Sequence, residues 1–321
     1  MRVLLFLIVS IFLANANNKL KVGVLSYGTV NWELQTIKNN NLDKKNGVNI
    51  EVVKLASKNA VSTALLSKSV DVIVTDFIWV NRQRTKGFDF TYYPYSKAVG
   101  AMFARPELNI DSLAKLEGKN LGVSGGSVDK TWLLMRAYSK YKYKQDLKDI
   151  VKPTYAAPPI LNKKLLDKSL AATINFWHFT AKLSAKGMIK VIGLDDILPE
   201  FGIKNDISFI GWTFSEGFAS KNKNLINGFL KASYEAKQLL NSKDEEWNRL
   251  RVLMKAKDDS IFKVLKEGYK KGIVKKFDKN NIEDSQKLYE LLVKEGGQKL
   301  VADALKLDEK TFYDFNHDIK W

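Results

Sequence analysis

The segment Gly122-Val123-Ser124-Gly125-Gly126-Ser127 is the strongest local candidate for ligand chemistry in the sequence. An apolar run leads into a glycine turn and then into a helical pattern, and backbone N–H groups in such a turn can approach a ligand closely. Ser127 suits the N-cap position, and the partial positive charge of a helix N-terminus favours an oxyanion. The expected chemistry is recognition and not catalysis. The spacing matches neither the P-loop pattern nor the dinucleotide-binding pattern.

Asp129 complicates the prediction of an anion site at this turn. A carboxylate in the first helical turn already satisfies the helix dipole, and it would repel a bound anion unless Lys130 offsets it. A purely structural turn and cap is therefore the alternative.

Other polar and aromatic side chains follow the apolar runs that we predict to be strands. In open α/β sheets ligands bind beyond the carboxyl ends of the strands, so these positions are candidate ligand contacts. In the first half of the chain the candidates are Ser26, Tyr27, Thr29, Asn31, Trp32, Thr75, Asp76 and Tyr95. For Asp76 the alternative is an N-cap role, followed by a core tryptophan.

In the second half of the chain, Asn175, Trp177 and His178 follow another apolar run. An amide beside aromatic rings would form a platform for a flat or apolar ligand, although aromatics at this density are more often core. His178 has no serine, carboxylate or second histidine at a catalytic or metal-binding spacing. Glu216 could meet a cationic or amide-bearing ligand, or it is a surface residue. Together with Ser124, Gly125, Gly126, Ser127 and Asp129, these residues complete the candidate site.

Composition excludes several classes of function. The chain has no cysteine, which rules out disulfides, thiolate metal sites and cysteine nucleophiles, and only two histidines, His178 and His317. We expect no metal and no cofactor. The formal charge of +17 suggests anionic partners, but the excess is almost entirely lysine, whereas readers of bases and phosphates favour arginine. Nucleic acid is therefore not an expected partner.

The elements that would position these residues form an α/β pattern of short apolar runs alternating with amphipathic stretches. Predicted strands cover residues 20–26, 48–55, 70–75, 99–104, 120–124, 171–175, 189–192 and 207–214. Predicted helices cover residues 30–40, 59–67, 77–85, 128–143 and 177–186, and then 224–240, 245–255, 259–271 and 282–305 in a lysine-rich helical extension. No repeat of 20–50 residues is apparent.

Residues 1–16 have the pattern of a secretory signal peptide. Arg2 precedes an apolar run, and Ala14-Asn15-Ala16 supplies a small-x-small cleavage site. With no cysteine at that position, we expect export to the periplasm without a lipid anchor.

Two long extended segments, 92–105 and 206–220, bracket a middle block with its own strand–helix units. If both are crossover segments, residues 101–209 form a second lobe inserted into a first lobe of residues 17–100 and 210–321. Paired crossings of this kind allow hinge closure around a ligand.

Taken together, these features resemble a known family. The segments that carry the resemblance, in chain order, are Lys21-Val22-Gly23-Val24, Asp71-Val72-Ile73-Val74-Thr75-Asp76, 116–127 and 175–178. They are similar to the periplasmic solute-binding proteins of ABC importers, in the branch that handles nitrate, sulfonates, taurine and thiamine pyrimidine precursors. The resemblance covers about residues 20–240.

This resemblance implies a two-lobed type II periplasmic binding fold, with a double hinge and a helical C-terminal extension, that holds its ligand between the lobes. It implies contacts from the loops at 26–32, 75–76, 124–127 and 175–178. Sulfonate binders typically have a proline before the glycine-serine turn, which this chain lacks, and the absence of cysteine excludes the activity of pyrimidine-synthase relatives. The aromatic loops favour an organic solute over a small inorganic anion.

The leading hypothesis is a monomeric, non-catalytic binding protein that delivers a small organic solute to an ABC permease. Two alternatives remain open. One is a secreted lyase or dehydratase on the same scaffold, with Asp76, Asp129 or Glu216 as acid or base. The other is a ligand-sensing subunit of a membrane receptor.

Overall fold

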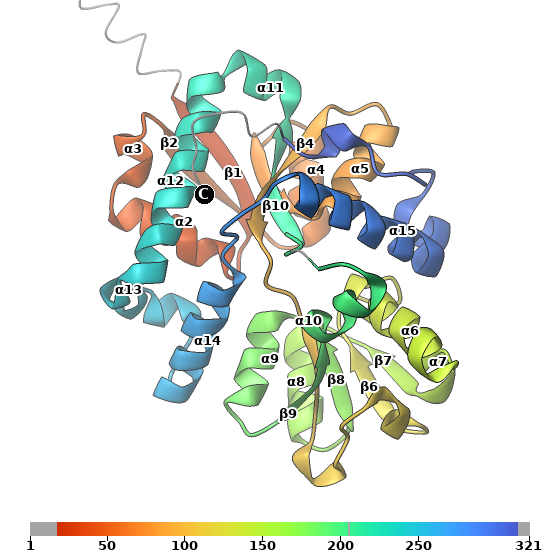
Figure 1. Cartoon of the computed structure of the whole chain (residues 1–321). Helices are drawn as coiled ribbons and strands as arrows, with labels where there is room; N and C mark the ends of the chain where they lie inside the picture. The colour runs from red at the N-terminus through yellow and green to blue at the C-terminus, as the bar shows by residue number, and fades with distance from the viewer. Residues whose placement is uncertain (1–17, 205, 314–321) are drawn as a thin grey trace, which may run out of the picture. The chain divides into compact units, whose positions relative to one another are not determined.

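The computed structural model describes residues 18–204 and 206–313, which group by their contacts into two compact units (Figure 1). Unit 1 contains the described parts of residues 1–93, 210–253 and 310–321, and unit 2 contains those of residues 94–209 and 254–309. The predicted signal peptide lies outside the described residues. Within them, no helix is both long enough and apolar enough to cross a membrane.

The sheet of unit 1 has the strand order β2-β1-β3-β10-β4. Strand β1 pairs in parallel with β2 and β3, and β10 runs antiparallel to β3. In β1, Leu20, Val22 and Val24 are buried while Lys19 and Lys21 are exposed, so the period-two pattern directs one face to the core. The strands are β1 (Lys19–Leu25), β2 (Asn49–Leu55), β3 (Val72–Thr75), β4 (Phe90–Ser96) and β10 (Ile210–Ser215).

Helices connect the parallel strands of unit 1 and pack on its sheet. Side-chain caps fix where two of them begin: Ser57 accepts a hydrogen bond from the N–H of Ala60 (3.1 Å), and Asp76 accepts one from the N–H of Trp79 (2.9 Å). The helices are α2 (Val30–Asn39), α3 (Leu42–Lys45), α4 (Lys58–Leu66), α5 (Phe77–Thr85), α11 (Glu216–Lys221), α12 (Lys223–Ser242) and α13 (Asp244–Met254).

The core of unit 1 contains a buried ion pair between α2 and α12. The Lys237 Nζ lies 2.7 Å from Glu33 Oε2, and the Ser233 hydroxyl donates to Glu33 Oε1 at 2.5 Å. Trp212 of β10 donates its indole N–H to the Ser233 oxygen at 2.9 Å. The glutamate is therefore neutralised and hydrogen-bonded where no water reaches it, which is the condition for burying a charge.

The sheet of unit 2 has the order β7-β6-β8-β5-β9, with β6 parallel to β7 and β8, and β5 antiparallel to β8 and β9. Its strands are β5 (Ala101–Ala104), β6 (Asn120–Val123), β7 (Lys152–Tyr155), β8 (Ala172–Asn175) and β9 (Ile189–Gly193). Its helices are α6 (Lys130–Tyr143), α7 (Leu147–Ile150), α8 (Pro158–Leu166), α9 (Trp177–Ser184), α10 (Leu194–Ile197), α14 (Asp259–Gly272) and α15 (Lys279–Val301).

The two units repeat one chain path at a spacing of 100 residues. The strand–helix segments 54–87 and 154–187 correspond position by position, with Lys-Ser at 68–69 and 168–169 and Lys-Gly at 86–87 and 186–187. Lys68 and Lys168 both adopt positive φ, 58° and 68°. In the sheets, β2, β1, β3 and β4 correspond to β7, β6, β8 and β9 at about this spacing, whereas β10 and β5 fill the remaining equivalent place from other points of the chain. The sequence shows no repeat of 20–50 residues, and the period of this repeat is longer than that.

Each predicted strand and helix has a counterpart in the structure within a few residues. The prediction missed β7, which contains Pro153, and α8, which begins with Pro158 and Pro159. Proline weakens both patterns but is tolerated in an edge strand and in the first helical turn. It also missed the short helices α3, α7 and α10. Strand β4 was predicted only as part of the extended segment 92–105, and α11 begins within the segment 206–220 that was expected to be extended.

The contact groups differ from the expected lobes in two segments. We expected residues 17–100 and 210–321 in the first lobe, whereas residues 94–100 and 254–309 group with unit 2. There α14 packs on α9 and α15 packs on α6. The expected division into lobes otherwise stays a prediction.

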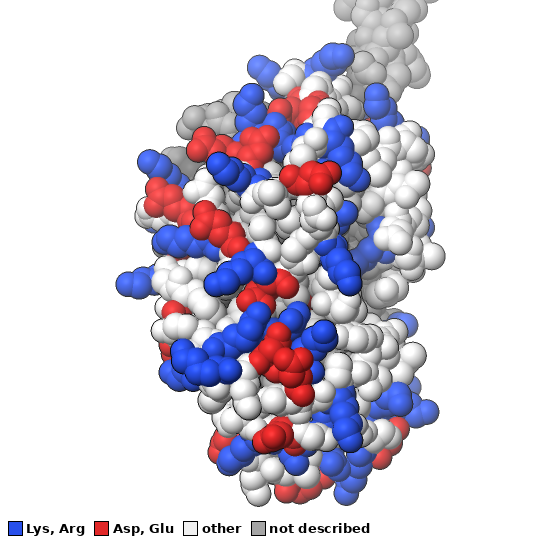
Figure 2. All heavy atoms as spheres, turned by 90° about the vertical axis from the view of Figure 1, so that its right-hand side faces the viewer, with Lys and Arg blue, Asp and Glu red and all other residues white. Residues whose placement is uncertain are grey.

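Acidic and basic side chains are interspersed on the face drawn in Figure 2. Many lysines pair with carboxylates, as Lys115 does with Asp111 (2.7 Å) and Lys142 with Glu200 (3.5 Å). This face is therefore mixed in charge, as the alternating charges of the sequence indicate.

Candidate binding site

Two predicted contacts in unit 1, Ser26 and Tyr27, are exposed at the carboxyl end of its sheet. Because β1 and β3 are parallel neighbours, Ser26 and Asp76 follow them at the same edge. Ser26 is exposed, and 58% of Tyr27 is open to solvent. A tyrosine held at a strand end with its ring in solvent can stack on a flat ligand.

Three other predicted contacts in the first loop have structural roles. Asn31 donates its side-chain amide to the carbonyls of Leu25 (3.0 Å) and Gly28 (3.3 Å), which braces the loop. The ring of Trp32 is 4% exposed and packs edge-on against Trp247. Thr29 is also buried, at the N-cap of α2, and its side chain makes no capping hydrogen bond.

Asp76 is the N-cap of α5, which is the structural alternative that the sequence left open. Its carboxylate caps α5 through the N–H of Trp79, and Thr75 beside it is half-buried. Since a capping carboxylate already occupies the start of α5, that helix end is unsuited to an anion.

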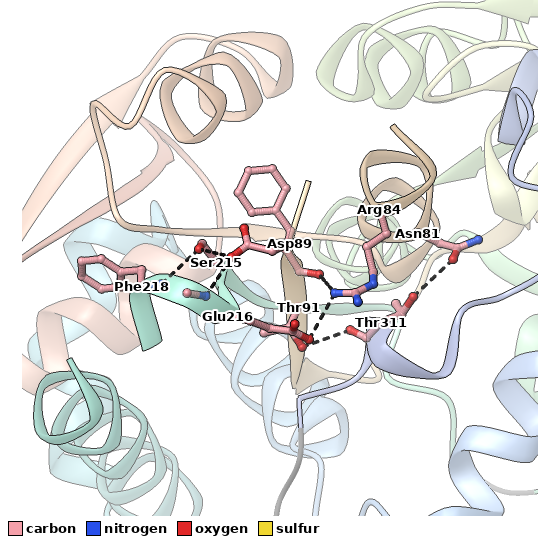
Figure 3. Close-up of polar contacts among 10 residues, drawn as sticks. Asn81, Arg84, Asp89, Thr91, Ser215, Glu216, Phe218 and Thr311 are labelled. Carbon is pink, nitrogen blue, oxygen red and sulfur yellow. Dashed lines mark hydrogen bonds and ion pairs between the residues drawn. The ribbon is translucent and has the colours of Figure 1, made fainter. Parts of the chain in front are cut away.

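Glu216 lies at the opposite edge of the unit 1 sheet from Ser26 and Asp76. It follows the carboxyl end of β10, which runs antiparallel to β3. Its carboxylate lies 3.1 Å from the Arg84 guanidinium, which also donates to the carbonyl of Phe90 at 2.8 Å (Figure 3). The structure therefore does not bring Glu216 together with the other unit 1 candidates.

A second carboxylate in Figure 3, that of Asp89, fixes the turn from β10 into α11. It accepts hydrogen bonds from the Ser215 hydroxyl (2.7 Å) and the Gly217 N–H (2.8 Å). These bonds outweigh the effect of burial and lower the pKa of Asp89. The cluster in Figure 3 is thus a set of satisfied structural contacts.

In unit 2, the glycine turn follows β6 as predicted, but the expected N-cap is wrong. Gly125 and Gly126 both have positive φ, 79° and 86°, which extends the turn so that α6 begins at Lys130. Asp129 is the N-cap and accepts the Trp132 N–H at 3.2 Å, while Ser127 is exposed before it. Asp129 therefore fills the helix end that could have held an anion.

Ser124 and Asn175 end neighbouring strands of unit 2, and both are buried. The Asn175 side chain donates to the Pro158 carbonyl (2.9 Å) and to Asn162 (2.8 Å), and it accepts the Phe176 N–H (2.9 Å). Its amide therefore ties β8 to α8. Ser124 donates its backbone N–H to the Ile174 carbonyl at 3.1 Å.

The start of α9 differs from the equivalent helix start in unit 1. Its N-cap is Phe176, whose side chain cannot accept a hydrogen bond, whereas Asp76 caps α5 at the corresponding position. The N-cap residue of α9 thus supplies no carboxylate, and α9 is better suited than α5 or α6 to a negatively charged or polar ligand group.

Trp177 and His178 begin α9, and both are half-buried. The Trp177 ring lies against Gly268 of α14, where an added Cβ would come within 2.7 Å of the ring. His178 lies between the rings of Trp177 and Phe179, at centroid distances of 5.7 and 4.5 Å. Burial, with a smaller effect from the charge of Lys182, lowers the pKa of His178 to about 4.

Tyr95, the remaining candidate, is 1% exposed, and its backbone N–H donates to the Ser208 hydroxyl at 3.2 Å.

Sequence reasoning missed Tyr155, which is 43% exposed at the end of β7, and Ile160, which is 49% exposed in the first turn of α8. No local signal marks either residue, because β7 and α8 were themselves missed by the prediction. No group of three or more metal-ligating side chains occurs among residues 18–204 and 206–313.

Comparison with protein families gives a match to the family described as NMT1/THI5 like, over residues 36–246. A search of curated proteins gave no match.

Solved structures of similar fold include two alkanesulfonate-binding proteins. The periplasmic aliphatic sulphonate binding protein SsuA from Escherichia coli has a TM-score of 0.70 and 16% identity, covering 95% of this chain and 96% of that one. The alkanesulfonate-binding protein SsuA from Xanthomonas axonopodis pv. citri, bound to MOPS, has a TM-score of 0.68 and 15% identity, covering 92% and 98%. The desulfurization enzyme DSZB has a TM-score of 0.59 and 12% identity, covering 92% and 98%. These likenesses confirm the predicted fold class.

Proposed function

Because the chain belongs to the NMT1/THI5-like family, we propose that it captures a small organic solute and delivers it to the membrane permease of an ABC importer. In this proposal it acts in the periplasm as a monomer and returns its ligand unchanged. The similar solute-binding structures support the role, and the signal-peptide pattern of residues 1–16 supports the location.

The observation that supports the proposal most directly is that both units expose a tyrosine at the carboxyl end of a parallel strand, at positions that the 100-residue repeat does not relate. Tyr27 follows β1, and Tyr155 is the last residue of β7. Each unit also has a helix start without a side-chain cap, at α2 and at α9. Such edges offer stacking surfaces and backbone donors, which suit recognition of a ligand better than proton transfer.

These features indicate the chemistry of the solute. Tyrosine rings favour a flat or apolar body, and a helix N-terminus favours a negatively charged or polar end. Small aromatic acids, pyrimidines and sulfonates meet both conditions. Sulfonates are included because two of the similar solved structures are those of sulfonate-binding proteins.

The test is a thermal-unfolding screen of residues 17–321 against those compound classes, followed by mass spectrometry of the stabilising compound. A ligand present at about 100 times its dissociation constant adds about 2.7 kcal/mol of stability. We expect one class to raise the unfolding midpoint and to be recovered unchanged. An amino-acid panel of equal concentration is the control.

Other outcomes would redirect the proposal. Conversion of the compound would favour an enzyme, a role that the fold also serves in the desulfurization enzyme DSZB. If deleting the gene abolishes the response to the solute but leaves its uptake intact, a sensor is favoured. If no class stabilises the protein, the proposed solute chemistry is wrong.

A further inference from the structure

One half-buried arginine of unit 1, Arg82 on α5, has no acceptor for its guanidinium. Its Nε is enclosed by the protein without a hydrogen-bond partner, and no ion pair of Arg82 occurs among residues 18–204 and 206–313. Arg84 on the same helix is in contrast satisfied by Glu216 and by the carbonyl of Phe90 (Figure 3). A guanidinium that is partly withdrawn from water and lacks an acceptor costs free energy, which an acceptor from outside the chain would recover.

A second cation lies about one helical turn beyond Arg82. Lys86 is the C-cap residue of α5 and is exposed, and within the described part of the chain its ammonium group has no ion pair either. Side chains four residues apart are neighbours on a helix surface. The negative end of the helix dipole stabilises both charges where they are, so both remain available to an anion.

A row of stacked aromatic rings begins on the same face of α5. Trp79 precedes Arg82 by three residues, which places the two on one side of the helix. The Trp79 ring stacks on Phe90 at a centroid distance of 5.7 Å, and Phe90 stacks on Phe88 at 5.4 Å. The row ends in solvent, because Phe88 is 41% exposed. The remaining side of α5 faces the core through Phe77, Ile78, Val80, Asn81 and Gln83.

We propose that Trp79, Arg82, Lys86 and Phe88, the α5 patch, form a docking surface for a partner protein that presents a carboxylate beside an apolar side chain. The guanidinium fork matches a carboxylate, and the exposed ring covers the apolar neighbour. Tryptophan and arginine are also the residues that most often dominate the energy of protein interfaces. The inference goes beyond the proposed function, because it concerns a protein partner and not the solute.

Charge favours a protein over an anionic membrane as the occupant of the α5 patch. Surfaces that bind anionic lipids gather about four to eight cations, whereas Arg82 and Lys86 are two. The carboxylate of Asp89, adjacent to Phe88 in the chain, is exposed, and its lowered pKa keeps it ionised. A negative charge at this position would repel a lipid surface, but a single partner carboxylate can be placed on Arg82 away from it.

The experiment selects a phage-displayed library of random peptides on the protein of residues 17–321 and measures the enriched peptides by fluorescence anisotropy. We expect these peptides to carry Asp or Glu beside a large apolar residue. Arg82→Gln and Phe88→Ala should each weaken their binding about tenfold or more. The control is Lys44→Gln, an exposed lysine on α3, with unchanged affinity. Equal affinities in all four proteins, or no enriched peptide, would overturn the α5 patch.

A charge reversal separates docking from a merely structural role of Arg82. Arg82→Glu should abolish binding of the acidic peptide, and a peptide with lysine in place of its acidic residue should bind Arg82→Glu but not the wild type. Absence of this exchange would contradict a direct contact. Phosphatidylglycerol vesicles are the second probe: binding that depends on Arg82 to vesicles but not to peptides would overturn the protein partner. Stabilisation by the solute should be the same in Arg82→Gln as in the wild type, so failure of the α5 patch and failure of the proposed function are distinguishable.

Discussion

The lowered pKa of His178 should make protein stability depend on pH. Its pKa is about 4 in the folded chain and about 6.5 when unfolded, so between these values the unfolded state binds more protons. The free energy of unfolding should therefore fall as pH drops from 6.5 towards 4, by about 1–3 kcal/mol after allowing for solvent contact. Urea unfolding at several pH values measures this. His178→Gln should flatten the dependence in that window, and an unchanged slope would contradict the prediction.

The Glu33–Lys237 pair should show the cost of an unpaired buried charge. Lys237→Met leaves the Glu33 carboxylate buried without its cation and should lower the free energy of unfolding by about 3–5 kcal/mol. The double variant Glu33→Leu with Lys237→Met removes both charges and should recover much of that loss. Denaturant titrations of the three proteins measure the coupling. If the double variant is as unstable as the single one, packing dominates at this position.

At the scale of elements, the C-terminal segment holds the edge of the unit 1 sheet. Phe312 forms a parallel bridge with Tyr92 of β4, is 6% exposed, and packs on the rings of Phe77 and Tyr92 at 5.8 Å. Phe312→Ala should cost about 3–5 kcal/mol and increase hydrogen exchange in β4. Leu305→Ala, at a site 60% exposed, is the control. Equal exchange in both variants would show that the segment does not support the sheet.

Element positions were predictable from the sequence because they depend on local periodicity. In β1 the alternation of lysine and apolar residues specifies a half-buried strand by itself. Side-chain roles were less predictable because they depend on distant partners. Trp32 is a core residue because Trp247 packs against it, and Trp177 meets Gly268, which no local pattern indicates. Ser127 and Asp129 both suit an N-cap, and only the turn geometry of Gly125 and Gly126 decides between them.

At the scale of the whole molecule, we propose that each unit contributes a contact to solute binding. Asp76 and Trp177 are poor probes of this idea, because substituting them would disturb a helix cap and a helix contact. Tyr27 and Tyr155 are better probes, since they are 58% and 43% exposed and their loss should leave the free energy of unfolding unchanged within about 0.5 kcal/mol.

Tyr27→Ala and Tyr155→Ala should each weaken binding of the identified solute about tenfold, which corresponds to the ~1.4 kcal/mol that an aromatic contact can supply. Tyr141→Ala, at a site 50% exposed on α6, is the matched control and should bind as the wild type does. Isothermal titration of the four proteins makes the comparison. A loss in only one variant would assign the solute to that unit alone. Wild-type affinity in both would show that the exposed tyrosines are not solute contacts, because a ring that stacks on the ligand cannot be removed without a measurable loss.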